Sequence, residues 1–230
     1  MERKKKNRAA SPEHPDVEVL KSVRALPQTM KSRFQLNLKP ATIEESLIHC
    51  LNSVGCGRGE TLYESTEYHN ALVELSVMLT SRTSRSGILF TGQFGTGKTT
   101  LMLAIRKLFE QLGNCPSAWS YQEVNSLENL YARAEDFRFP IVSYDKFTEA
   151  ASAPILFLDN LGIETDTPED ALAVGLIKNL IRLRYDLRLL TVIATPLDGQ
   201  SIREVYGNQI ASIMGTSYFV LGFDWEPFRK

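Results

Sequence analysis

The chain has 230 residues, a formal net charge of −1 and a hydrophobic content of 43%. That length is enough for one main domain with a sizeable core. The near-neutral charge gives no overall indication of nucleic-acid binding, and the three cysteines are too few for a disulfide framework or a four-cysteine zinc site. No apolar segment approaches the length of a membrane span, and the basic N-terminus is not followed by the apolar stretch of a signal peptide. We therefore expect a cytoplasmic protein without membrane contact.

The first forty residues differ from the rest of the chain in charge. Residues 1–40 contain ten Lys or Arg and four Asp or Glu, which gives +6 against −7 for the remainder. Several prolines interrupt this stretch, and a segment of this kind cannot bury much apolar area. We expect residues 1–41 to form a basic, largely disordered tail and linker. It would serve either as a solvated tail or as a contact for nucleic acid or for an acidic partner surface.

Two amphipathic helices are expected next, at the start of a domain that we place at residues 42–230. Thr42 and Glu45 form a capping-box pattern, and apolar residues follow at helical spacing up to Gly55. The second helix, at about residues 64–80, has an apolar face made of Tyr68, Ala71, Leu72, Leu75 and Leu79.

Residues 92–99 lie between an apolar strand predicted at 86–91 and an amphipathic helix, and they match the phosphate-loop pattern G-x-x-x-x-G-K-[ST]. Glycines allow consecutive backbone N–H groups to surround a phosphate. Lys98 would reach the β- and γ-phosphates, the Thr99 hydroxyl would ligate Mg²⁺, and the helix N-terminus would add its dipole. We therefore predict a nucleotide site made of Gly92, Gln93, Phe94, Gly95, Thr96, Gly97, Lys98, Thr99 and Thr100.

Apolar strands alternate with amphipathic helices beyond this loop. The loop helix is expected to stop at Gly113. Further strands are predicted at 118–121, 153–159, 189–194 and 219–222, and further helices at 125–134 and 169–184. The later of these helices carries one apolar face made of Leu172, Leu176, Leu180 and Leu183. The alternation predicts an α/β fold with a parallel sheet covered by helices on both faces.

Two polar residues at strand ends are candidates for the same site. Asp159 ends an apolar strand 61 residues beyond Lys98. In the predicted sheet it lies beside Thr99, where its carboxylate would hold Mg²⁺ directly or through a water. Thr195 follows the strand at 189–194 and occupies the place of a polar sensor of the γ-phosphate and the attacking water. The alternative for Thr195 is an ordinary Thr-Pro strand terminus.

Together these motifs resemble the AAA+ family of DnaC-type helicase loaders and IstB-type transposition ATPases. The resemblance covers about residues 64–229 and is most specific in the phosphate loop and in the run LDNLGIE. It extends more loosely to Arg184-Tyr185, residues 193–197, Tyr206-Gly207 and residues 222–225. It implies a P-loop fold with ATP as ligand, and a protein that acts on a replicative helicase or a transposase through its N-terminal region, usually in contact with DNA. Only five residues follow Trp225, so no C-terminal helical lid is expected.

Catalytic groups of the family pattern are replaced in this chain. Asn160 stands where most members have a second carboxylate that polarises the attacking water, and an amide cannot accept a proton. Gln209 and Ile213 stand where the family supplies arginines, one of which acts on the nucleotide of a neighbouring subunit. The resemblance therefore implies weak or partner-dependent hydrolysis, and it argues against a self-assembled ring while leaving other oligomers open.

Other side chains could supply the missing groups. Glu164 is the candidate catalytic base, with a plain surface charge as the alternative. Arg203 and either Arg182 or Arg184 are the candidate arginines, with a solvated helix face as the alternative for the last two. Trp225 is either a base-stacking platform or a core anchor, and the anchor is favoured.

The sequence thus favours an ATP-binding loader or adaptor in which nucleotide occupancy controls the grip on a helicase or transposase. Two alternatives stay open. A P-loop small-molecule kinase would need arginines on a mobile lid, and no arginine cluster is placed for one. A nucleotide-independent interaction module with a vestigial phosphate loop would show no affinity for Mg-ATP.

Overall fold

The computed structural model describes residues 35–55, 66–81, 85–112, 119–123, 147, 150–162 and 170–227. Several features predicted from the sequence lie outside these described residues: most of the basic tail, the end of the loop helix at Gly113, the helix at 125–134 and Glu164.

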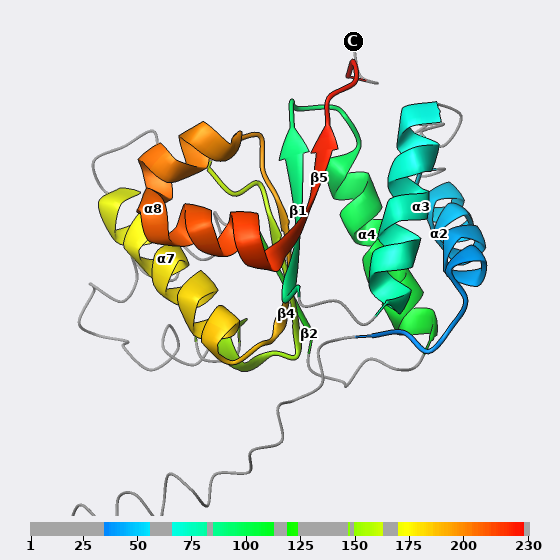
Figure 1. Cartoon of the computed structure of the whole chain (residues 1–230), viewed down its shortest axis with the longest axis horizontal. Helices are drawn as coiled ribbons and strands as arrows, with labels where there is room; N and C mark the ends of the chain where they lie inside the picture. The colour runs from blue at the N-terminus through cyan, green and yellow to red at the C-terminus, as the bar shows by residue number, and fades with distance from the viewer. Residues whose placement is uncertain are drawn as a thin grey trace, which may run out of the picture. The chain divides into compact units, whose positions relative to one another are not determined.

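Five parallel strands form the central sheet (Figure 1). The order across the sheet is β2-β3-β4-β1-β5, and every pair of neighbours is parallel. β3 and β4 are buried along their whole length because helices cover both faces of the sheet. The predicted fold class is confirmed. The strands are β1 (Gly87–Gly92), β2 (Trp119–Glu123), β3 (Ile155–Asp159), β4 (Leu190–Ala194) and β5 (Tyr218–Phe223).

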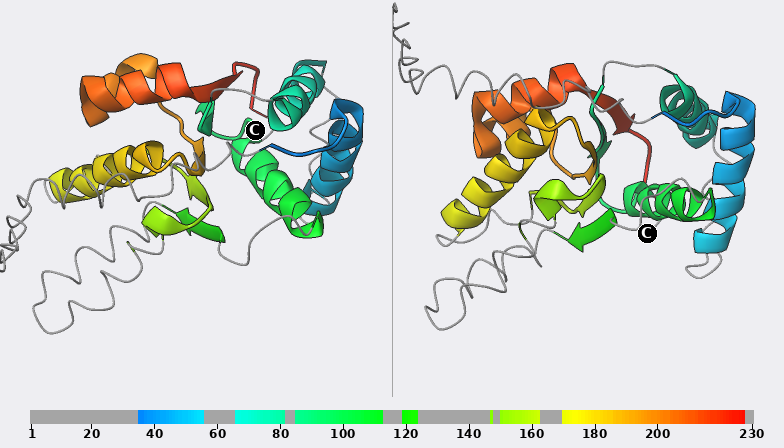
Figure 2. Two further views of the ribbon diagram at one scale, coloured as in Figure 1. Left: turned by 60° about the horizontal axis from the view of Figure 1, so that its bottom comes forward. Right: turned by 90° about the horizontal axis from the view of Figure 1, so that it is seen from below.

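Three helices cover one face of the sheet, α2 (Pro40–Gly55), α3 (Thr66–Thr80) and α4 (Lys98–Gln111). α4 contacts β4 and α2, and α3 contacts α2 and β5 (Figure 2). All five apolar residues predicted for the inner face of α3 are buried. They share one core with the inner side chains of α2 and α4 and with those of four strands, which include Ile88, Phe90, Phe157 and Val192.

The packed domain begins before residue 42. Leu36 is only 2% exposed, and its N–H donates to the Leu79 carbonyl at 2.8 Å. α2 begins at Pro40, which suits the first turn of a helix because a proline has no N–H to satisfy there. Thr42 therefore lies inside the first turn, where its carbonyl accepts the Ser46 hydroxyl at 2.7 Å. The capping-box prediction placed the start of this helix too late.

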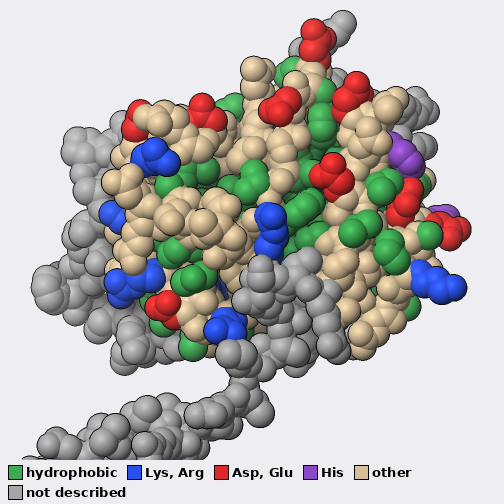
Figure 3. Space-filling view, viewed as in Figure 1, with side chains coloured by type: hydrophobic (Ala, Val, Ile, Leu, Met, Phe, Trp, Pro, Cys, Tyr) green, Lys and Arg blue, Asp and Glu red, His purple; other side chains and the backbone are tan. Residues whose placement is uncertain are grey.

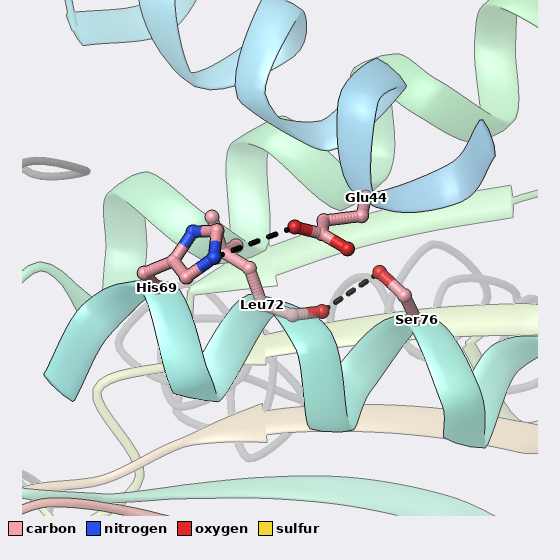
Figure 4. A network of polar contacts seen from close by, with 4 residues as sticks. All are labelled: Glu44, His69, Leu72 and Ser76. Carbon is pink, nitrogen blue, oxygen red and sulfur yellow. Dashed lines mark hydrogen bonds and ion pairs between the residues drawn. The ribbon is translucent and has the colours of Figure 1, made fainter. Parts of the chain in front are cut away.

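One polar contact joins α2 to α3, and another pairs a hydroxyl within α3 (Figure 4). Glu44 Oε1 lies 3.6 Å from His69 Nε2, but both side chains are partly exposed, so this contact adds little stability. On the inner side of α3 the Ser76 hydroxyl donates to the Leu72 carbonyl at 2.7 Å. A buried hydroxyl in the core is thereby paired.

Two helices, α7 (Asp170–Asp186) and α8 (Gly199–Ser217), cover the opposite face. No helix is predicted from the sequence at the position of α8. Asp198 caps α8 by accepting the Ser201 N–H at 2.7 Å, and Gly207 interrupts it with a φ of 83°. This break divides α8 into two shorter helices, which weakens its periodic pattern. None of the described helices has the length and apolar character needed to cross a membrane.

The inner face of α7 differs from the predicted one. Leu180 is buried as expected, but Leu183 is 40% exposed, and Ile177 and Ile181 are buried in its place. Arg184 shares this inner face and is 0% exposed. The solvated helix face that was predicted for the two arginines therefore fits the exposed Arg182 and is wrong for Arg184.

The Arg184 guanidinium is bound by backbone oxygens from two segments. It donates to the carbonyls of Ala150 and Ala153, both at 2.7 Å, and to that of Leu190 at 2.6 Å. It also donates to the Thr191 hydroxyl at 2.9 Å. Burial lowers the pKa of this guanidinium to about 10, although the charge of nearby Tyr218 acts in the opposite direction. Arg184 thus joins α7 to the start of β4 and to the residues that precede β3.

Candidate nucleotide-binding site

The candidate site lies at the carboxyl edge of the sheet, which is the upper edge in Figure 1. β1 leads through residues 93–97 into α4 on one face, whereas β4 leads into α8 on the other face. The point where two such connections diverge at the ends of neighbouring strands is the usual place for a ligand in an open parallel sheet. Acidic side chains gather along this edge (Figure 3), and the Lys98 ammonium brings a positive charge to the loop.

The loop has backbone angles that require glycine. Gly92, Gly95 and Gly97 have φ values of 131°, 81° and 92°. A Cβ atom on Gly92 would also overlap the Phe223 carbonyl oxygen of β5. Glycine at these positions leaves the loop free to fold closely around an anion. Phe94, at the outer tip, is 62% exposed, whereas Thr96 and Thr100 are buried.

The Lys98 side chain folds back over the loop. Its ammonium donates to the carbonyls of Gly92 at 2.6 Å and Gln93 at 2.5 Å, and it lies 3.4 Å from the Thr96 hydroxyl. Burial lowers the pKa of Lys98 to about 8, and the negative charge of Asp159 opposes that shift. A phosphate here would meet a dehydrated cation whose charge is strongly felt at short range.

Thr99 and Asp159 are brought together by α4 and β3. The Thr99 hydroxyl donates to Asp159 Oδ1 at 3.0 Å, and the carboxylate is 1% exposed. Two hard oxygen ligands beside a phosphate loop fit Mg²⁺, which is held by one or two protein ligands together with phosphates and waters. No cluster of three or more His, Cys, Asp or Glu occurs among the described residues, so an all-protein metal cage is not found there.

The Thr195 hydroxyl is engaged by the backbone. It donates to the Leu161 carbonyl at 2.6 Å and accepts the Leu197 N–H at 3.1 Å, and the residue is 0% exposed. These bonds hold the turns after β3 and β4 together. The geometry favours the strand-terminus alternative over a hydroxyl that reaches the γ-phosphate.

Asn160 is tied to the neighbouring carboxylate through its backbone. Its N–H donates to Asp159 Oδ1 at 3.0 Å, and its φ of 61° lies in the left-handed region, which asparagine tolerates better than most residues. The side-chain amide cannot act as a base. Glu164, the candidate replacement base, lies outside the described residues.

The positions of the family arginines lie on the second half of α8. Ile213 is 8% exposed and belongs to the core between α8 and the sheet, whereas Gln209 is exposed. The core therefore occupies one of the two places where an arginine was expected. Arg203, on the first half of α8, is exposed.

Trp225 contacts the phosphate loop itself. Its indole N–H donates to the Thr96 carbonyl at 3.1 Å, and its ring centroid lies 4.7 Å from that of Phe223 and 5.6 Å from that of Tyr68. These contacts support the anchor interpretation. A pocket of about 260 Å³ lies alongside, lined by Gly92, Gln93 and residues 223–227.

The burial of Arg184 and the contact of Trp225 with Thr96 were not predicted from the sequence. Arg184 follows Ile177, Leu180 and Ile181 at helical spacing, so the pattern of buried positions on α7 could have revealed it. The contact of Trp225 with Thr96 joins residues 129 apart, and no local pattern indicates it.

Comparison with solved structures identifies the fold. The chain is similar to the crystal structure of the DnaC helicase loader, with a TM-score of 0.55, 20% identity, and coverage of 69% of this chain and 91% of that one. It is similar to the crystal structure of DnaI, with a TM-score of 0.53, 18% identity and coverage of 69% and 86%. The chain shares the fold of these two structures, and the predicted α/β fold with a parallel sheet between helices is thereby confirmed.

A third similar structure is the replication initiator DnaA bound to AMPPCP and single-stranded DNA, with a TM-score of 0.50 and 14% identity. The matched region is 62% of this chain and 42% of the DnaA chain. A scan of protein-family models finds no match, and no curated protein matches the sequence.

Proposed function

We propose that this chain, which has the fold of AAA+ helicase loaders, is an ATP-controlled loader or adaptor that acts on a replicative helicase in the cytoplasm. The observation that carries the proposal is the placement of the Thr99 hydroxyl 3.0 Å from the Asp159 carboxylate, directly beside the glycine loop and Lys98. Residues from two separate elements meet there as oxygen ligands and a phosphate-binding cation. Packing alone does not require that combination.

Different residues of the site would bind different parts of a nucleotide and its metal ion. Glycines at 92, 95 and 97 give the loop its curvature, and the N-terminus of α4 points its N–H groups at the phosphates. Lys98 would neutralise phosphate charge, and Thr99 and Asp159 would hold Mg²⁺, which would add positive charge beside the phosphates. Occupancy would then set the geometry of the loop and of the elements that contact it.

Slow hydrolysis is part of the same proposal. Asn160 cannot accept a proton, and the exposed Gln209 and buried Ile213 cannot stabilise transition-state charge as an arginine does. Such a chain stays in the ATP-bound form, and a partner that contributes an arginine would trigger hydrolysis and end that form.

Calorimetry tests the nucleotide half of the proposal. Wild type should bind Mg-ATP with micromolar affinity, and Lys98→Ala should abolish that binding. Lys178→Ala, which removes an exposed lysine on α7, is the matched control and should bind like wild type. No affinity of the wild type for Mg-ATP would instead favour the vestigial-loop module, and phosphoryl transfer to a small acceptor would favour the kinase.

A pull-down from the native host tests the partner. Wild-type and Lys98→Ala chains are used as bait with and without Mg-ATP, and the captured proteins are identified by mass spectrometry. The proposal expects a replicative helicase whose recovery depends on ATP for the wild type only. Recovery of a transposase would move the chain to the transposition branch, and nuclease treatment of the lysate shows whether DNA bridges the two proteins.

A further inference from the structure

The last residue of β5 and the segment that follows it touch the phosphate loop at two places. The Phe223 carbonyl lies against Gly92, so closely that a Cβ atom there would overlap it. Two residues later, the Trp225 indole N–H donates to the Thr96 carbonyl at 3.1 Å. Both the beginning and the middle of the loop are therefore backed by the C-terminal segment.

Neighbouring rings hold Trp225 in this orientation. The Phe223 and Tyr68 rings lie 4.7 Å and 5.6 Å from its centroid, and Tyr68 is itself 0% exposed in α3. The Phe223 ring in turn packs edge-on against Phe90 of β1, at 5.5 Å. An indole fixed by buried rings on two elements presents its N–H in one direction and loses little further freedom when it donates.

The bond from Trp225 orients one peptide unit of the loop. In a trans peptide the carbonyl of Thr96 and the N–H of Gly97 point in opposite directions, and none of the described residues has a cis peptide bond. Because the carbonyl is held toward Trp225, the Gly97 N–H points away from it. This N–H is one of the consecutive groups that a loop of this pattern presents to a phosphate.

We propose that Trp225 is a positioning residue of the phosphate loop: its indole N–H fixes the Thr96–Gly97 peptide for phosphate binding, so Trp225 senses occupancy of the loop. The inference rests on the proposed nucleotide binding and adds to it a residue outside the loop motif. It also gives an optical signal, because Trp119 and Trp225 are the chain's two tryptophans.

Substitution and calorimetry form the first test. Trp225→Phe keeps a ring in the aromatic cluster but removes the N–H donor. We expect its affinity for Mg-ATP, Mg-ADP and pyrophosphate to fall by a similar factor of about five, the net value of one hydrogen bond. Trp119→Phe is the matched control and should bind like wild type. Trp119 pairs with Ile155 at the beginning of β2, whereas Asp159 pairs with Glu123 at the other end of that strand. A loss for Mg-ATP that pyrophosphate does not share would overturn the inference.

Fluorescence forms the second test and does not depend on how well Trp225→Phe folds. In the Trp119→Phe chain all tryptophan fluorescence comes from Trp225, and Mg-ADP should change this fluorescence saturably. The change should vanish in the Lys98→Ala, Trp119→Phe double variant, and the Trp225→Phe chain should show none. If wild type binds nucleotide but Trp225 emission and Trp225→Phe affinity stay unchanged, the inference fails alone. If wild type binds neither nucleotide nor pyrophosphate, the proposed function fails and the inference with it.

Discussion

The buried guanidinium of Arg184 gives the sharpest prediction about stability. Arg184→Met keeps a long, flexible apolar stem on the inner face of α7 but removes every donor. Three backbone carbonyls, those of Ala150, Ala153 and Leu190, and the Thr191 hydroxyl would lose this partner. None of the hydrogen bonds that Arg184 makes among the described residues goes to a carboxylate. The expected loss of stability therefore comes from these carbonyls and the Thr191 hydroxyl.

The magnitude follows from the cost of unpaired buried acceptors. Each costs about 1–3 kcal/mol when its partner is removed, and removal of the dehydrated cation returns part of this sum, so we expect a loss of about 3–5 kcal/mol. For a chain of this size about 2–4 °C is lost per kcal/mol, which predicts a drop in Tm of about 6–20 °C.

Urea unfolding followed by circular dichroism measures this loss, with calorimetry for Tm. Arg182→Met is the matched control, because Arg182 lies two positions earlier on the same helix and is exposed. Its free energy of unfolding should stay within about 0.5 kcal/mol of wild type. If Arg184→Met also stays within that range, the carbonyls do not depend on the guanidinium and the reasoning is refuted.

Four further predictions concern the site. Gly92→Ala should abolish Mg-ATP binding in calorimetry and cost about 1–3 kcal/mol in urea unfolding, because its φ is 131°; Gly175→Ala, with nothing within 4 Å of its added methyl, should be neutral or stabilising. The pKa of Lys98 is lowered to about 8, so between pH 8 and 10.5 the folded chain binds fewer protons than the unfolded chain, and stability from this group rises with pH through that window. Phosphate binding needs the ammonium, so Mg-ATP affinity should fall about ten-fold from pH 7 to pH 9 with proton uptake detectable in buffers of different ionisation enthalpy, and a flat pH profile would contradict the assignment. Thr195→Val should lower the free energy of unfolding by about 1–3 kcal/mol while Mg-ATP affinity changes less than about two-fold; a large loss of affinity would restore the sensor role. Asn160→Asp should raise ATP turnover on the order of ten-fold or more in a phosphate-release assay, and an unchanged rate would show that the missing base does not limit hydrolysis.

Most of the correct predictions rest on hydrophobic periodicity and on the spacing of the glycines. The apolar run at 155–158 identifies β3, and the glycine loop identifies the turn between β1 and α4, because both signals are local. The proximity of Thr99 to Asp159 was also predictable, since the carboxyl ends of all strands in a parallel sheet lie at one edge.

Long-range contacts account for the parts that could not be predicted. Arg184 was assigned to solvent because its charge dominated the interpretation, yet the carbonyls of Ala150 and Ala153, 34 and 31 positions away, bind it in the core. Thr195 looked like a sensor because of its position after β4, and only the turns at Leu161 and Leu197 show where its hydroxyl goes. Such partners depend on how segments meet in three dimensions.

The strand order has a consequence for the synthesis of the protein. β1, which carries the phosphate loop, pairs with β4 and β5, so Gly87 has Thr191 and Tyr218 as its neighbours across the sheet. A nascent chain that ends before β4 offers β1 neither partner. The ribosome must release residues up to Phe223 before the strand is held on both sides. Nucleotide binding should thus appear only after β5 has been released, since contacts between residues far apart in the chain form late.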